Sequence, residues 1–130
     1  MLSKPKFGWT TISLGDFIGS ASYITDVPID VMESMIDALN NHKDFIVSFD
    51  AEGWCFKIIA DDYRSFIIEE KDEPILYVCE KNKLELAKEI LDDITTYKED
   101  WYHWTVDEEN EKEYKMEICS YLRKLKKSLI

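Results

Sequence analysis

The first 80 residues contain six short segments rich in apolar, β-branched and aromatic residues, a composition that is typical of β-strands. The stretches 7–14 and 17–24 are rich in β-branched and aromatic residues. Gly15-Asp16, which joins them, has the composition of a hairpin turn. The chain is therefore predicted to begin with an antiparallel pair of strands.

Four more strands are predicted between the first helix and residue 80. Their ranges are 45–49, 54–60, 63–69 and 75–80. The segments between them are short and rich in Asp, Gly and Pro, which are residues that favour tight turns. Short turns join antiparallel neighbours, so these strands are expected to form a meander.

The periodicity changes to that of a helix in three places. A first helix should begin near Pro28 and end near Asn40, with Met32, Met35 and Leu39 on one face. Asn82 and Glu85 resemble a capping box before the stripe 84–97. Thr105 and Glu108 repeat that pattern before a last stripe, 114–125, and the final 50 residues contain neither glycine nor proline.

These elements predict one α+β domain covering residues 1–130, in the order ββ-α-ββββ-αα. An antiparallel sheet of about six strands is expected, with the helices mainly on one of its faces. The helix-free face, or an edge of the sheet, is then available for a partner.

The charge is strongly acidic and unevenly placed, with 27 acidic against 16 basic residues. Residues 1–80 hold 15 acidic and 6 basic residues, a net charge of −9, whereas residues 81–130 hold 12 and 10, a net charge of −2. Such a surface repels nucleic acid and anionic lipid and steers a basic partner into contact. Net charge also keeps a protein dispersed in solution, so it does not identify the partner.

No motif in the chain predicts catalysis, cofactor binding or metal binding. His42 and His103 each lack a ligand partner at metal-site spacing, and phosphate-binding glycine loops are absent. Cys55, Cys79 and Cys119 lie far apart and form no Cys-x-x-Cys pair, so reduced thiols in a cytoplasmic protein are expected. No apolar run approaches the length of a membrane span, and no export signal is evident, so neither a membrane nor a nucleic acid is expected as a partner.

Two sets of residues are candidates for partner binding. Trp101-Tyr102-His103-Trp104 cannot all face one core from a helix or a strand, so at least one should reach the surface, and Trp101 and Trp104 are the candidate anchors. The second set consists of acids in the predicted turns, which are exposed because buried loop backbone would lack hydrogen-bond partners. In a meander, one end of the sheet gathers these five: Asp50, Glu52, Glu70, Asp72 and Glu73.

Short motifs in the first 60 residues resemble those of immunity proteins from bacterial polymorphic toxin systems. They are Phe7-Gly8-Trp9, Gly15-Asp16-Phe17-x-Gly19-Ser20-Ala21-Ser22-Tyr23, Asp26-Val27-Pro28 and Phe49-Asp50-Ala51-Glu52-Gly53-Trp54. The resemblance implies a small cytosolic domain that binds and neutralises a cognate toxin by occlusion, without chemistry of its own. An acidic antagonist fits a basic toxin such as a nuclease, whose cleft must hold phosphates.

Two other classes of function remain open from the residues alone. One is a small hydrolase that uses an acidic pocket near Asp50, Glu52 and Asp61. The other is a generic adaptor or regulatory domain. A deep pocket with convergent carboxylates would favour the enzyme, whereas a basic protein partner would favour the immunity protein.

Overall fold

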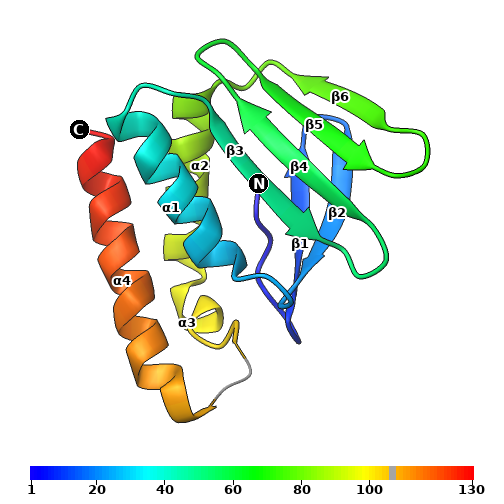
Figure 1. The fold of residues 1–130 in the computed structure, drawn as a ribbon. Helices are drawn as coiled ribbons and strands as arrows, with labels where there is room; N and C mark the ends of the chain where they lie inside the picture. Colours follow the sequence, from blue (N-terminus) through cyan, green and yellow to red (C-terminus); the bar gives the residue numbers. More distant parts are fainter. Residues whose placement is uncertain (106–107) are drawn as a thin grey trace.

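The computed structural model describes residues 1–105 and 108–130, and the predicted order ββ-α-ββββ-αα is confirmed (Figure 1). A four-residue helix and a 3-10 turn lie between the last two long helices. The elements are β1 (Trp9–Leu14), β2 (Phe17–Ser22), α1 (Val27–Asn40), β3 (Phe45–Asp50), β4 (Cys55–Ala60), β5 (Ser65–Glu70), β6 (Ile75–Cys79), α2 (Lys83–Thr96), α3 (Lys98–Trp101), the 3-10 turn η1 (Glu108–Asn110) and α4 (Glu111–Ser128).

The single sheet of about six strands is the part of the fold prediction that is wrong, because the strands form two sheets. β1 pairs with β2 on one side and with the segment at Leu2 on the other, and β3 to β6 form a separate antiparallel meander in the order β3-β4-β5-β6. Helix α1 lies alongside β3 (Figure 1), so that edge is not open to the hairpin. The hairpin instead packs behind the four-stranded sheet.

Aromatic contacts hold the hairpin against the inner face of that sheet. The ring of Phe17 lies 4.8 Å from the ring of Phe56 and 5.3 Å from the ring of Tyr77, measured between centroids. A Cβ at Gly19 would lie 2.6 Å from Phe17 and 3.1 Å from Phe56. Glycine at this position therefore allows the close approach of the two sheets.

Each long helix buries one apolar face in the common core. In α1 these residues include Val31, Met32, Met35 and Ala38, and in α2 they are Leu86, Ala87, Ile90 and Ile94, together with Lys83. The predicted capping box of α2 is confirmed: the Glu85 N–H donates to Asn82 Oδ1 at 2.9 Å, and the Asn82 N–H donates to Glu85 Oε1 at 3.3 Å. The box predicted at Thr105 and Glu108 does not cap α4, which is preceded by Asn110. The side chain of Glu108 lies outside the described residues.

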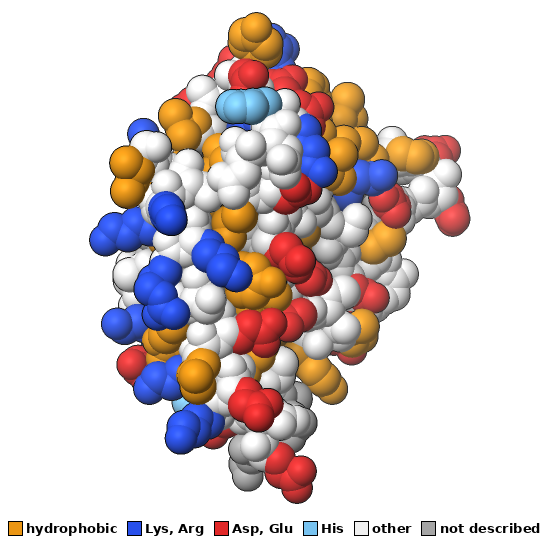
Figure 2. Space-filling model, turned by 60° about the vertical axis from the view of Figure 1, so that its left-hand side comes forward, with side chains coloured by type: hydrophobic (Ala, Val, Ile, Leu, Met, Phe, Trp, Pro, Cys, Tyr) orange, Lys and Arg blue, Asp and Glu red, His pale blue; other side chains and the backbone are white. Residues whose placement is uncertain are grey.

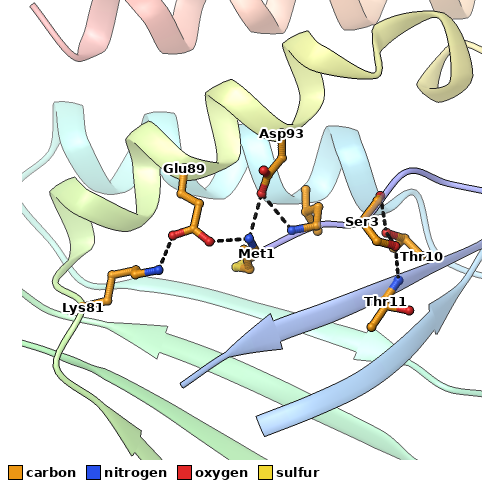
Figure 3. Close-up of polar contacts among 8 residues, drawn as sticks. Met1, Ser3, Thr10, Thr11, Lys81, Glu89 and Asp93 are labelled. Atoms are coloured by element: carbon orange, nitrogen blue, oxygen red, sulfur yellow. Dashed lines mark hydrogen bonds and ion pairs between the residues drawn. The ribbon is translucent and has the colours of Figure 1, made fainter. Parts of the chain in front are cut away.

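The N-terminal amino group is anchored to α2 (Figure 3). The ammonium of Met1 donates to Glu89 and, at 2.8 Å, to Asp93, which also accepts the Leu2 N–H at 2.9 Å. Lys81 pairs with the other oxygen of Glu89. Burial alone would raise the pKa of Glu89, but hydrogen bonds from Lys81 and from the N-terminal ammonium outweigh it and lower this pKa. The first strand is thereby tied to the helical layer.

Candidate interaction surface on the outer sheet face

The strands β3 to β6 present a row of large apolar side chains on the face that points away from the hairpin. Side chains alternate along each strand, so the register of the meander aligns every second residue across the sheet. One row is Ile46, Ile59, Phe66 and Val78, and the next row is Ser48, Lys57, Ile68 and Leu76. We call these two rows the outer sheet face.

The outer sheet face is exposed although six of its eight side chains are large and apolar. Ile46, Leu76 and Val78 are 53%, 59% and 50% exposed, and the other three apolar residues are partly exposed. No helix or strand of the described chain passes in front of β4, β5 and β6 (Figure 1). Cross-strand neighbours lie about 5 Å apart, so the six side chains form one contiguous patch. Patches of this kind mark interaction sites.

The acids at the β3–β4 end of the sheet are brought together as the sequence predicts. In the register of the sheet, Asp50 lies opposite Cys55, and Cys55 lies opposite Glu70. The two carboxylates therefore border the outer sheet face in a third row. The Cys55 thiol donates to Glu70 at 3.2 Å, and this bond is the main reason why the pKa of Glu70 is lowered. Glu52 is exposed in the same turn, and its N–H donates to Asp50 at 2.7 Å.

The remaining two predicted acids lie in the neighbouring turn. Asp72 and Glu73 are both exposed between β5 and β6. Lys71, the base in this turn, pairs with Glu69 at 3.4 Å and lies over the ring of Trp54 at 4.6 Å. Lys71 is thus directed at Glu69, and Lys57 pairs with Glu70 at 3.5 Å. The other four predicted acids, Asp50, Glu52, Asp72 and Glu73, form no ion pair with a residue that the structure describes.

A second group of acids, which sequence reasoning did not assign to a site, lies along the β3 edge of the outer sheet face. Asp30, Glu33 and Asp37 of α1 line a groove of about 650 Å³ together with Ile46 and Ser48. Burial, followed by the nearby charges of Asp26 and Glu33, raises the pKa of Asp30. The spacing of these acids places them on one helical face, but only the packing of α1 along β3 brings that face to the sheet.

The prediction that Trp101 and Trp104 are surface anchors is wrong. Both indoles are fully buried, with ring centroids 5.3 Å apart, and Trp104 Nε1 donates to the carbonyl of Thr25 at 3.0 Å. The short helix α3 and the turn after it rotate both tryptophans inward. His103 is the member of the cluster that reaches the surface, where it pairs with Glu111 at 2.9 Å.

The acids of the alternative enzyme hypothesis do not converge. Asp50 and Glu52 lie at one end of β4, and Asp61 lies at the other end. Asp61 accepts two backbone N–H groups at 2.8 Å, from Arg64 and Tyr63, and these bonds lower its pKa as expected for a turn residue. Among the described residues, no group of three or more His, Cys, Asp or Glu side chains could hold a metal ion. No helix in the described part of the chain is long and apolar enough to cross a membrane.

No protein-family model matches this chain, and no match was found among curated proteins or solved structures. The resemblance to immunity proteins therefore depends on the motifs of the first 60 residues.

Proposed function

We propose that this chain is a binding protein that neutralises a basic cognate toxin by occlusion, and that the outer sheet face is its binding surface. The observation that carries the proposal is the contiguous apolar patch on a sheet face that no other element of the described residues covers. Large apolar side chains bordered by polar residues are the usual anatomy of a protein interface.

The patch offers enough apolar surface to stabilise a complex. Complete burial of an exposed Leu or Ile side chain contributes about 1.5–3 kcal/mol. Leu76 and Ile46 are each about half exposed, so covering them contributes on the order of 1 kcal/mol apiece. The four remaining apolar residues of the outer sheet face add to this, so the centre of the interface is apolar.

The charges around the patch favour a basic partner over a second copy of this chain. Acids border it on two sides, at Asp50 and Glu70 and along α1. Two copies meeting through this face would bring two net charges of −11 together, with like charges facing each other. A partner with an apolar centre and a Lys- and Arg-rich rim complements both features. A nuclease toxin has a basic surface of this kind.

The proposal is tested by the stoichiometry with which the chain inhibits the toxin. The chain is co-expressed with the product of the adjacent gene, the complex is purified, and the activity of the freed toxin is titrated with the isolated chain. We expect activity to fall linearly and to vanish at one equivalent, because occlusion consumes one binding surface per toxin. Inactivation by far less than one equivalent would contradict occlusion, and a neighbouring product that neither binds nor is inhibited would contradict the proposed function.

A further inference from the structure

A second surface lies on the helical side of the molecule, between α2 and α4. It is a groove of about 540 Å³ whose floor is formed by Leu91, Leu122, Tyr102 and Cys119. The Tyr102 hydroxyl and the Cys119 Sγ share a hydrogen bond of 3.2 Å within this floor. This bond, followed by burial, raises the pKa of Tyr102 to about 12 from an ordinary value that already leaves the hydroxyl neutral at pH 7. The floor is therefore uncharged and mostly apolar.

The rim of the groove is basic, in contrast to the rest of the chain. Lys88, Lys98, Arg123 and Lys126 line it, and Asp92 is the acid beside them. None of the four bases forms an ion pair with a residue that the structure describes. In Figure 2 the helical side of the molecule faces the viewer. Lys and Arg gather along one side of this view, and Asp and Glu gather along the other.

Helix capping does not explain all four of these bases. Lys126 lies in the last turn of α4, where a cation interacts favourably with the helix dipole. Lys88 lies in the second turn of α2, far from the last turn where the helix dipole favours a cation. The four bases therefore have the groove in common, but they do not occupy equivalent positions in their helices.

We infer that the α2–α4 groove binds a small amphipathic anion, a medium-chain fatty acid carboxylate, with the aliphatic chain on the apolar floor and the carboxylate paired with bases of the rim. Pockets for small molecules measure about 300–1,000 Å³, which includes this one. The lining residues of α2 run from Lys88 to Thr95 and those of α4 from Cys119 to Lys126, so each helix contributes a length of about 10 Å to the groove.

A partner helix fits the groove less well than an extended aliphatic chain does. A helix with its side chains is about 10 Å across, so a length of about 10 Å has a volume of roughly 800 Å³, and only about two-thirds of it could lie within the groove. The groove shares no residue with the outer sheet face, so this inference is independent of the proposed function.

The test is titration of the full chain with sodium dodecanoate below its micelle concentration, by isothermal calorimetry. We expect saturable one-to-one binding, with shifts of the NMR signals of Leu91, Cys119 and Leu122. Each added CH₂ from decanoate to tetradecanoate should tighten Kd by up to about fourfold, since burial of one CH₂ is worth about 0.8 kcal/mol. Dodecanol and the dodecyltrimethylammonium cation should bind at least tenfold more weakly than dodecanoate.

Matched double variants test the role of the bases. Lys88→Glu with Arg123→Glu should weaken dodecanoate binding at least tenfold. Lys112→Glu with Lys127→Glu makes the same charge change outside the groove and should weaken it less than twofold. Circular dichroism confirms that both proteins are folded.

Four results would overturn the inference. They are the absence of saturable dodecanoate binding, equal weakening by both double variants, equal affinity for dodecanol, and binding of an acidic amphipathic helical peptide where dodecanoate does not bind. The last result would assign the groove to a protein partner.

Discussion

Replacement of Phe17 by alanine removes the main contact between the hairpin β1–β2 and the four-stranded sheet. Phe17 is fully buried, and its ring contacts Phe56 and Tyr77 at centroid distances of 4.8 and 5.3 Å. Truncation of a buried phenylalanine costs about 3–5 kcal/mol. Phe17 also forms two aromatic pairs, each worth about 0.5–1.5 kcal/mol beyond burial. We therefore expect Phe17→Ala to lower the free energy of unfolding by about 4 kcal/mol. For a chain of this length, Tm should fall by about 12–20 °C.

The matched control is the next residue on the same strand. Ile18 points to the other side of the hairpin and is 72% exposed, so Ile18→Ala should change stability by less than about 0.5 kcal/mol. Urea unfolding followed by circular dichroism gives both free energies of unfolding. Phe17→Leu, expected to cost about 1.5 kcal/mol, keeps the comparison possible if Phe17→Ala does not fold. Equal losses for Phe17→Ala and Ile18→Ala would refute the packing of the hairpin on the sheet.

Three further predictions concern individual side chains. Tyr114→Phe removes the 2.6 Å hydrogen bond to the half-buried carboxylate of Asp26 and should lower the free energy of unfolding at pH 7 by about 2 kcal/mol in urea titrations. Phe7 is 88% exposed and has a φ of 53° in a two-residue turn. Asparagine tolerates this conformation better, so Phe7→Asn should raise the free energy of unfolding by about 0.5 kcal/mol in urea titrations. A loss of stability would contradict this prediction. The lowered pKa of Glu89 means that its ion pairs stabilise the fold above the unfolded-state pKa and are lost as pH falls through the folded-state pKa. Glu89→Gln should therefore be less stable than the natural chain at pH 7, and denaturation at a series of pH values should show the difference shrinking below about pH 4.

The elements of this fold could be predicted because their determinants are local. The capping box at Asn82 and Glu85 and the turn after Leu14 are encoded within a few residues. The division into two sheets could not be predicted, since it depends on Phe17 meeting Phe56, which is distant in sequence. The burial of Trp101 likewise follows from the four-residue helix α3, which is too short to show a periodic pattern.

The candidate site, like the fold, could be predicted only in part from the sequence. Alternate turns of a meander lie at the same end of the sheet, so the proximity of Asp50 and Glu70 followed from the order of the strands. The acids of α1 were missed because α1 reaches the sheet only through its packing along β3. Leu76 and Ile68 share a face because of the register between β5 and β6, and the hairpin covers the other face through contacts between distant residues, so neither fact could be predicted from the sequence.

The central claim, that the outer sheet face binds the toxin, is tested most directly by the affinity of Leu76→Lys. Leu76 lies on the edge strand β6, and this change places a charge within an apolar contact, so Kd should rise at least tenfold, which corresponds to about 1.4 kcal/mol. Ile18→Lys makes the same chemical change at an exposed residue of the other sheet and should alter Kd by less than twofold. Surface plasmon resonance on the purified toxin gives both values. An unchanged affinity of the folded Leu76→Lys variant, or an equal loss for Ile18→Lys, would contradict the account.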